Sequence, residues 1–325
     1  MEALAIIDIR PLFGGPQAAQ RGVDDAVGDA IARHGGFVVS GFPGADRIDS
    51  LGATMLGFFD LGDDEKRAVA SKSTWPDGPA VYRGWKSSLE VGAWAYNEMY
   101  DIGPAQPHPG PAVAGMHHFA EVNSWPAVEP CAGWRAAMEA YYGLMLDVGM
   151  AVMRAAGRAA GFDDAHLVAG FHTGNHTLRL LNYPPRPEGH ITADERAQPD
   201  GPHIAAARHT DVSGVSLLWQ RQPGLQAQAP DGTWRDVPVM DGTVSVHLGT
   251  VLQLMTGGRI PATPHRVIDH GVARQSIGFF VEPGLATRLA PLDDPVDDVR
   301  ASYGWHLQER FHSMRGYTDI VPAPA

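Results

Sequence analysis

Apolar and polar positions follow a helical period through much of the first half of the chain. From Gln17 to His34 apolar residues recur at Val23, Val27 and Ile31, and a Gly-Gly pair follows as a helix end. The same spacing predicts helices over 46–59, from 63 onward and over 134–160, with short strands over 4–9 and 37–39. Residues 71–130 show no clear period and are rich in proline, glycine and aromatic residues, which is typical of a binding segment.

The second half of the chain has a different pattern. After residue 170, strand-like runs of four to eight residues alternate with turns such as Asp231-Gly232 and Asp241-Gly242. The predicted strands are 177–183, 205–209, 213–219, 224–227, 233–237, 244–248, 252–256, 265–267 and 276–281. Many short strands at close spacing indicate a sandwich or a barrel. A final helix is predicted over 303–314, followed by a loose tail over 321–325.

Composition narrows the function classes. Apolar residues make up 44% of the 325, enough for a sizeable core, and the net charge of −12 without a Lys/Arg-rich run argues against a nucleic-acid partner. A single cysteine, Cys131, cannot form an internal disulfide, which favours a reducing, cytoplasmic setting. The first residues lack a signal-peptide pattern, and no run of about 20 apolar residues predicts a membrane span.

Three residues form a candidate metal site. His209 and Asp211 are two apart, so on a strand their side chains point to the same face, and His265 would supply a third ligand. Two histidines and one carboxylate with open positions are typical of non-heme Fe(II) oxygenases. An H-x-D triplet alone is weak evidence in a chain with 15 histidines, and a surface histidine capped by an aspartate is the plain alternative. The ligand set by itself also leaves a zinc hydrolase open.

Several motifs in order give this triplet its weight. Residues 178–185 (LRLLNYPP), 209–211 (HTD), 224–226 (GLQ), 265–267 (HRV) and 274–276 (RQS) resemble the isopenicillin N synthase-like group of Fe(II)/2-oxoglutarate-dependent dioxygenases. Residues 248–258 are similar to the strand that precedes the distal histidine in that family. Residues 6–8, 36–39 and 58–61 resemble its helical N-terminal region, so the resemblance covers most of the chain.

The resemblance implies an α+β fold with a double-stranded β-helix (jelly-roll) core. We expect one domain, with a mainly helical region over 1–170, the catalytic core over 171–290, and a C-terminal helix and tail over 291–325. It also implies that His209, Asp211 and His265 are the metal ligands and catalytic residues, with Fe(II), 2-oxoglutarate and O₂ as cofactor and cosubstrates. The other histidines lack a carboxylate at the right offset, so we expect them to have no role in the metal site.

Four residues are predicted to bind 2-oxoglutarate. Arg274 and Ser276 share a strand face, and a guanidinium with a hydroxyl suits a carboxylate. The resemblance assigns this pair and Tyr183 to the distal carboxylate. The asparagine that relatives often carry three residues before the proline is Leu181 here, and Arg179 would compensate, as in a bacterial branch that includes ethylene-forming enzyme. An unremarkable edge-strand arginine is the alternative for Arg179.

The substrate pocket is expected in the aromatic stretch 81–101 and the C-terminal segment. The resemblance to the same bacterial branch points to Glu90, Tyr82, Trp85 and Arg315 as substrate-binding residues, and an acid with an arginine would suit an amino acid or a natural-product intermediate. The predicted reaction is hydroxylation, desaturation or cyclisation of a small molecule. Two alternatives remain: a 2-oxoglutarate-independent oxidase of the same fold, and a non-catalytic β-barrel binding protein.

Overall fold

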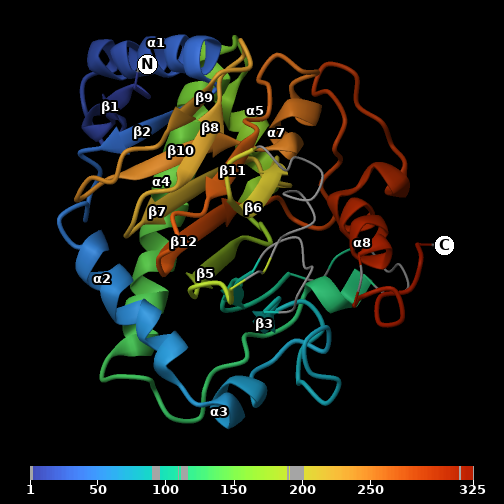
Figure 1. Cartoon of the computed structure of the whole chain (residues 1–325). Coiled ribbons are helices and arrows are strands. Elements are labelled where there is room, and N and C mark those ends of the chain that lie inside the picture. Colours follow the sequence, from blue (N-terminus) through green and yellow to red (C-terminus); the bar gives the residue numbers. More distant parts are fainter. Residues whose placement is uncertain are drawn as a thin grey trace.

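Two β-sheets form the centre of the molecule (Figure 1). The computed structural model describes residues 3–89, 96–108, 110, 116–188, 190, 201–314 and 316–324. The larger sheet has eight strands in the order β1-β2-β10-β7-β12-β5-β4-β3. Their bounds are β1 Ile6–Asp8, β2 Gly36–Ser40, β3 Gly84–Ser87, β4 Glu98–Ile102, β5 Thr177–Tyr183, β7 Val215–Gln220, β10 Val244–Leu248 and β12 Arg274–Val281.

The smaller sheet has four strands in the order β6-β11-β8-β9. They are β6 Ile204–His209, β8 Leu225–Gln228, β9 Trp234–Asp236 and β11 His265–Ile268. Every pairing in both sheets is antiparallel except β1 with β2. One cavity is lined by strands of both sheets, so the two sheets face each other as in a jelly roll. The expected α+β fold with a jelly-roll core is confirmed.

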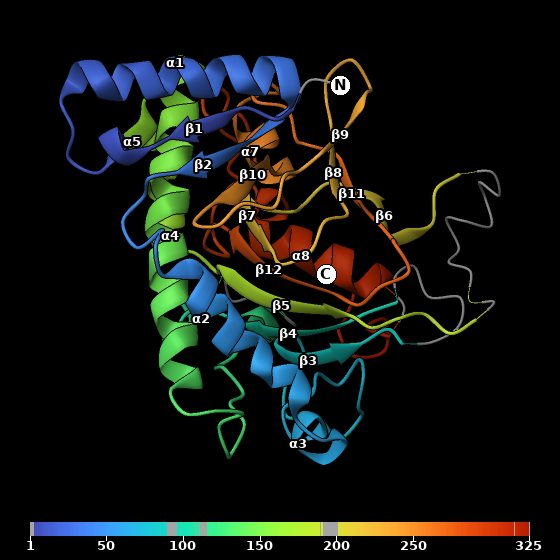
Figure 2. The ribbon, with the colours of Figure 1, turned by 60° about the vertical axis from the view of Figure 1, so that its left-hand side comes forward.

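Helices α1 and α4 lie against the larger sheet, and the other helices lie around it (Figure 2). The bounds are α1 Gln17–His34, α2 Ile48–Met55, α3 Asp63–Arg67, α4 Trp134–Ala159, α5 Asp164–Val168, α7 Thr250–Met255 and α8 Tyr303–Ser313. The long helix α4 lies against β7 and β12 at Gly149, where an added Cβ would come within 2.4 Å of Val281. Glycine at this position therefore lets the helix backbone approach the sheet closely. No helix in the described part of the chain has both the length and the apolar character to cross a membrane.

Three predictions about local structure were wrong. Residues 252–256 were expected as a strand, but residues 252–255 belong to helix α7 and Thr256 follows its end. The backbone N–H and the hydroxyl of Thr250, in the first turn of this helix, both donate to the carbonyl of Asp211. Residues 71–130, expected to be irregular, contain β3 and β4. The tail is not loose at Val321, which is fully buried and whose carbonyl contacts His312 of α8.

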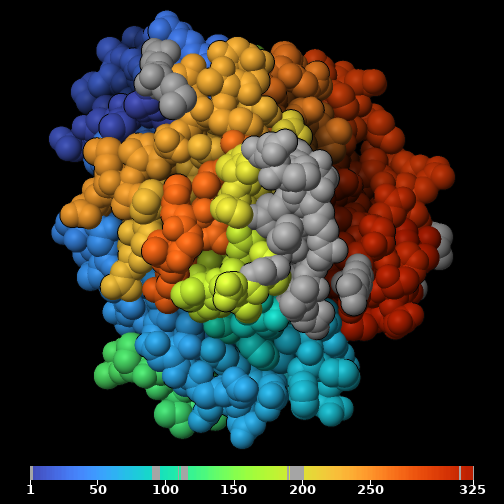
Figure 3. Space-filling model, viewed as in Figure 1, coloured from blue at the N-terminus to red at the C-terminus, as the bar shows by residue number. Residues whose placement is uncertain are grey.

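The strand β4 was missed because its pattern is not amphipathic. All five of its residues are buried, including Glu98 and Asp101. Both carboxylates are paired with lysines on neighbouring segments, so charged residues occupy positions that usually carry apolar side chains. The C-terminal segment, red in Figure 3, forms one flank of the face on which the smaller sheet is exposed.

Candidate active site

The three predicted metal ligands come together at the edge of the smaller sheet. His209 ends β6 and pairs with His265, which begins β11, and Asp211 follows β6 by two residues. One ligand atom from each of the three lies within 4.8 Å of the others. The Nε2 atoms of His209 and His265 are 3.7 Å and 3.6 Å from the carboxylate oxygens of Asp211.

Backbone carbonyls orient both imidazole rings. The Nδ1 atom of His209 lies 2.7 Å from the carbonyl of Ala207, and that of His265 lies 3.1 Å from the carbonyl of Thr263. A carbonyl only accepts, so each Nδ1 carries the proton and each Nε2 presents a lone pair. Such an outer contact is usual for a histidine that binds metal, because it fixes both the tautomer and the ring orientation.

The electrostatics around His209, Asp211 and His265 suit a cation. Oxygen Oδ2 of Asp211 is buried and has no hydrogen-bond partner among the described residues. Burial acts to raise the pKa of Asp211, but the His265 and His209 rings and a contact from Ser216 hold that pKa below its ordinary value. Burial lowers the pKa of His209, which favours the neutral imidazole that binds metal. Neutral nitrogen donors, an ionised carboxylate and an orphaned buried oxygen fit a divalent ion such as Fe(II).

A second polar group, the predicted carboxylate site, lines the same cavity from the larger sheet. The Arg274 guanidinium donates to the Ser276 hydroxyl at 2.9 Å and to the Gln220 amide oxygen at 3.1 Å, and lies 5.5 Å from the Tyr183 ring centre. Arg274 is 5% exposed, and no carboxylate in the described ranges pairs with it. Burial lowers the pKa of Arg274, as expected for a buried cation without a counter-ion. A bound carboxylate would supply that counter-ion.

The cavity between the sheets joins these two groups. Its remaining walls are formed mostly by apolar side chains, together with the polar residues Arg179, Asn97 and Gln220. The lining residues are Asn97, Met99, Arg179, Leu181, Tyr183, Ala206, His209, Asp211, Leu218, Trp219, Gln220, Leu225, His265, Val267, Arg274, Ser276 and Phe280. A concave, largely apolar site with a few convergent polar groups is typical of a small-molecule pocket.

Arg179 lines the cavity but is not free. Its Nε and Nη2 atoms donate to the two carboxylate oxygens of Asp101 at 2.8 Å and 2.7 Å. Its side chain is 28% exposed, against 2% for Asp101. The arginine therefore reaches the cavity from a fixed position.

Of the four predicted substrate residues, the two that the structure describes do not lie beside the three metal ligands. Tyr82 is buried and packs edge-on against Phe119 and Phe311, and the Trp85 indole donates to Glu98. Neither ring lines the cavity that contains the metal ligands. Glu90 and Arg315 lie outside the described residues.

Two residues of this site had no sequence signal. Asn97 is 1% exposed and lines the cavity, and its Oδ1 has no hydrogen-bond partner in the described ranges. His247 packs its ring 4.7 Å from the His265 ring, although its sequence context lacks a paired carboxylate. Both depend on contacts between distant segments, which no local motif shows: Asn97 directly precedes β4, and His247 on β10 meets His265 on β11 across the two sheets.

Comparisons with known proteins agree with this geometry. Residues 174–283 match the model of the 2OG-Fe(II) oxygenase superfamily. The chain is 31% identical to isopenicillin N synthase of Streptomyces clavuligerus over 95% of this chain and 94% of that protein. It is 29% identical to a 2-oxoglutarate-dependent dioxygenase of Monascus ruber over 89% of this chain and 88% of that one.

Solved structures show the same fold. A Neurospora crassa protein crystallised with α-ketoglutarate and 5-formyluracil superposes with a TM-score of 0.72 at 23% identity, covering 94% of each chain. JOX2, crystallised with 2OG, Fe and JA, superposes with a TM-score of 0.72 at 19% identity, covering 100% of this chain and 90% of that one. Enzymes of this superfamily are oxidoreductases that use Fe(II), 2-oxoglutarate and O₂. The similarity to isopenicillin N synthase over nearly the whole of both chains shows that this chain belongs to the 2OG-Fe(II) oxygenase superfamily, among its isopenicillin N synthase-like members.

Proposed function

We propose that this chain oxidises a small molecule by hydroxylation, desaturation or cyclisation, with Fe(II) held by His209, Asp211 and His265. The observation that carries the proposal is one cavity that contains both this ligand set and the buried Arg274, which has no carboxylate partner among the described residues. Bound Fe(II) would activate O₂ and couple the decarboxylation of 2-oxoglutarate to oxidation of the substrate. The zinc hydrolase alternative has no use for Arg274.

The residues of the chain position the reactants. The Nε2 atoms of His209 and His265 and the carboxylate of Asp211 would hold the metal. The Arg274 fork and the Ser276 hydroxyl would bind the distal carboxylate of 2-oxoglutarate through charge-assisted bonds, each worth roughly 1.5–3 kcal/mol. The packing of Tyr183 near the guanidinium supports its assignment to the same carboxylate.

Arg179 is our candidate for the other end of 2-oxoglutarate. Arg274 pairs with Tyr183 on the neighbouring strand, and Arg179 precedes Tyr183 by four residues on that strand. Four strand residues span about 13 Å, and both side chains line the space between. Two long guanidinium side chains reaching into one cavity from opposite ends suit a dicarboxylate.

The prime substrate is proposed to be a small molecule with an apolar body and a hydrogen-bonding group. Met99, Leu218 and Phe280 line the cavity with apolar surface. The buried amide of Asn97 needs a partner, because an unsatisfied buried polar group costs about 1–3 kcal/mol. An amino acid or natural-product intermediate remains a prediction, and so do Glu90, Tyr82, Trp85 and Arg315 as its contacts. We also propose a single-domain enzyme of the cytoplasm, for which the single cysteine is the support.

Succinate release tests the reaction class. The protein is incubated with Fe(II), 2-oxoglutarate and O₂ against a panel of amino acids and small metabolites. Succinate that rises with one panel member, together with an oxidised product, is the expected result. Product without succinate would establish the 2-oxoglutarate-independent oxidase. Absence of a visible absorption band with Fe(II) and 2-oxoglutarate under anaerobic conditions would favour the non-catalytic binding protein.

A further inference from the structure

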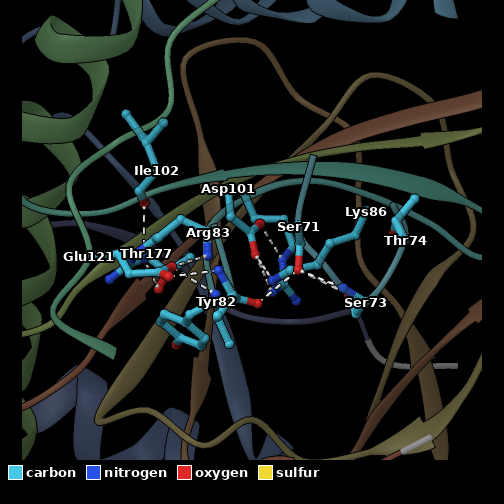
Figure 4. Close-up of polar contacts among 12 residues, drawn as sticks. Ser71, Ser73, Thr74, Tyr82, Arg83, Lys86, Asp101, Ile102, Glu121 and Thr177 are labelled. Atoms are coloured by element: carbon cyan, nitrogen blue, oxygen red, sulfur yellow. Dashed lines mark hydrogen bonds and ion pairs between the residues drawn. The ribbon is translucent and has the colours of Figure 1, made fainter. Parts of the chain in front are cut away.

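Three charged side chains lie together behind one wall of the cavity. Lys86 on β3, Asp101 on β4 and Arg179 on β5 belong to adjacent strands, and Asp101 is directly opposite Arg179. Figure 4 shows the side chains of Lys86 and Asp101 pointing toward each other. Only Arg179 of the three lines the cavity.

A single carboxylate serves both cations. Oxygen Oδ2 of Asp101 accepts from Lys86 Nζ at 2.8 Å and from Arg179 Nη2 at 2.7 Å. The Lys86 and Asp101 side chains are 11% and 2% exposed, so water screens this contact weakly. Since one negative charge is divided between two positive charges, the guanidinium of Arg179 is only partly neutralised.

The nearby carboxylates make their hydrogen bonds and ion pairs with other residues, and Glu282 acts on Arg179 only through a weaker, longer-range attraction. Glu98 pairs with Lys66 at 3.2 Å, and Glu282 accepts from Thr177 and Tyr303 at 2.7 Å each. Glu121 accepts from the backbone N–H groups of residues 81–83. None of these three has a hydrogen bond to Lys86 or Arg179 in the described part of the chain.

We propose that Lys86 and Asp101 are positioning residues for cosubstrate binding. Asp101 fixes the direction of Arg179 through a two-point contact, and Lys86 draws on the same carboxylate, which leaves Arg179 with positive charge for an anion in the cavity. The anion is the carboxylate at the keto-acid end of 2-oxoglutarate. This inference rests on the proposed function and adds two residues that do not touch the ligand.

A double-mutant cycle tests the coupling. The dissociation constant Kd of 2-oxoglutarate is measured by anaerobic titration of the Fe(II)-loaded protein for wild type, K86M, R179Q and the double variant. We expect K86M to raise Kd about threefold to tenfold, because Asp101 then neutralises Arg179 more fully. In the R179Q background the same change should alter Kd less than twofold, since contacting residues are not additive.

A matched control is Lys66. It is also a buried lysine paired with a strand carboxylate, with a side chain 10% exposed, and it does not contact Arg179. K66M should lower the melting temperature in the same range as K86M and leave Kd unchanged. K86Q, which keeps a donor to Asp101 without the charge, replaces K86M if the latter does not fold.

Two outcomes overturn the proposal. One is a Kd in K86M, or in K86Q, that changes no more than in K66M, and the other is an equal effect of K86M in the wild-type and R179Q backgrounds. Failure of the proposed function would look different, because wild type itself would then show no saturable response to 2-oxoglutarate.

Discussion

Two polar regions of this molecule differ in how their buried groups are satisfied. In the first, the paired region around β3, β4 and β5, each buried charge has a partner of opposite sign: Glu98 pairs with Lys66, and Asp101 pairs with Arg179 and Lys86. In the cavity, Asp211 has an orphaned oxygen and Arg274 has no carboxylate partner among the described residues. Buried charges are costly unless paired, so the pairing in the first region lets the fold keep these charges, whereas the second region is arranged for ligands that the chain does not supply.

The largest effect is expected at the three metal ligands. His209→Ala should reduce substrate-dependent succinate formation by more than a hundredfold, because only two of the three protein ligands, Asp211 and His265, then remain. The melting temperature without metal should stay within a few degrees of wild type. Added Fe(II) should raise the melting temperature of wild type much more than that of the variant, since only a bound ligand shifts the folding equilibrium. Wild-type turnover in His209→Ala would contradict the ligand assignment.

The second largest effect is expected at Arg274, which also lines the cavity. Arg274→Ala removes two charge-assisted bonds to 2-oxoglutarate, each worth roughly 1.5–3 kcal/mol, so its apparent constant should rise about a hundredfold or more. The constant for the prime substrate should change far less. Steady-state kinetics with each reactant varied in turn measures both, and an unchanged constant for 2-oxoglutarate would favour the oxidase alternative.

The Glu98–Lys66 pair, which does not contact Arg179, should respond in stability instead of cosubstrate binding. Glu98→Gln leaves Lys66 as a buried cation without its partner, and breaking such a pair typically costs about 3–5 kcal/mol. Denaturant unfolding should show this loss, while the affinity for 2-oxoglutarate measured below the transition stays near wild type. A variant as stable as wild type but weak in 2-oxoglutarate binding would reverse the distinction between the two regions.

The smallest effect concerns pH. Burial raises the pKa of Glu282 to about 7, above its ordinary 4.5. The Arg83 charge and the hydrogen bonds that Glu282 accepts from Thr177 and Tyr303 act to lower that pKa, but burial has the larger effect. A carboxyl that binds its proton more tightly when folded stabilises the fold below pH 4.5, and that contribution is lost as pH rises through 7. Glu282→Gln should therefore flatten the fall in melting temperature between about pH 5 and 8. Parallel pH profiles for the two proteins would refute this assignment.

The sequence predicted the ligand-binding region better than the paired region. His209, Asp211, His265, Arg274 and Ser276 stand in short motifs whose spacing on strands already implies shared faces, and the structure brings them into one cavity. The elements that the sequence did not predict depend on contacts with distant residues. The first residue of the helix over 250–255 donates its backbone N–H to the carbonyl of Asp211, and the charges of β4 are neutralised by residues far away in the sequence.

Substrate recognition was the least predictable part for the same reason. Tyr82 and Trp85 are aromatic residues in a stretch without a clear hydrophobic period, where a buried packing role and a binding role give the same local pattern. Asn97 has no pattern around it, and its orphaned amide becomes visible only when β4 is placed beside β5.

The most direct test of the central claim is a crystal structure of the anaerobic protein with Mn(II), as a redox-stable substitute for Fe(II), and 2-oxoglutarate. We predict the metal on Nε2 of His209 and His265 and on the carboxylate of Asp211, with the distal carboxylate of 2-oxoglutarate on Arg274 and Ser276. A metal bound to other residues, or a distal carboxylate away from Arg274, would contradict the account.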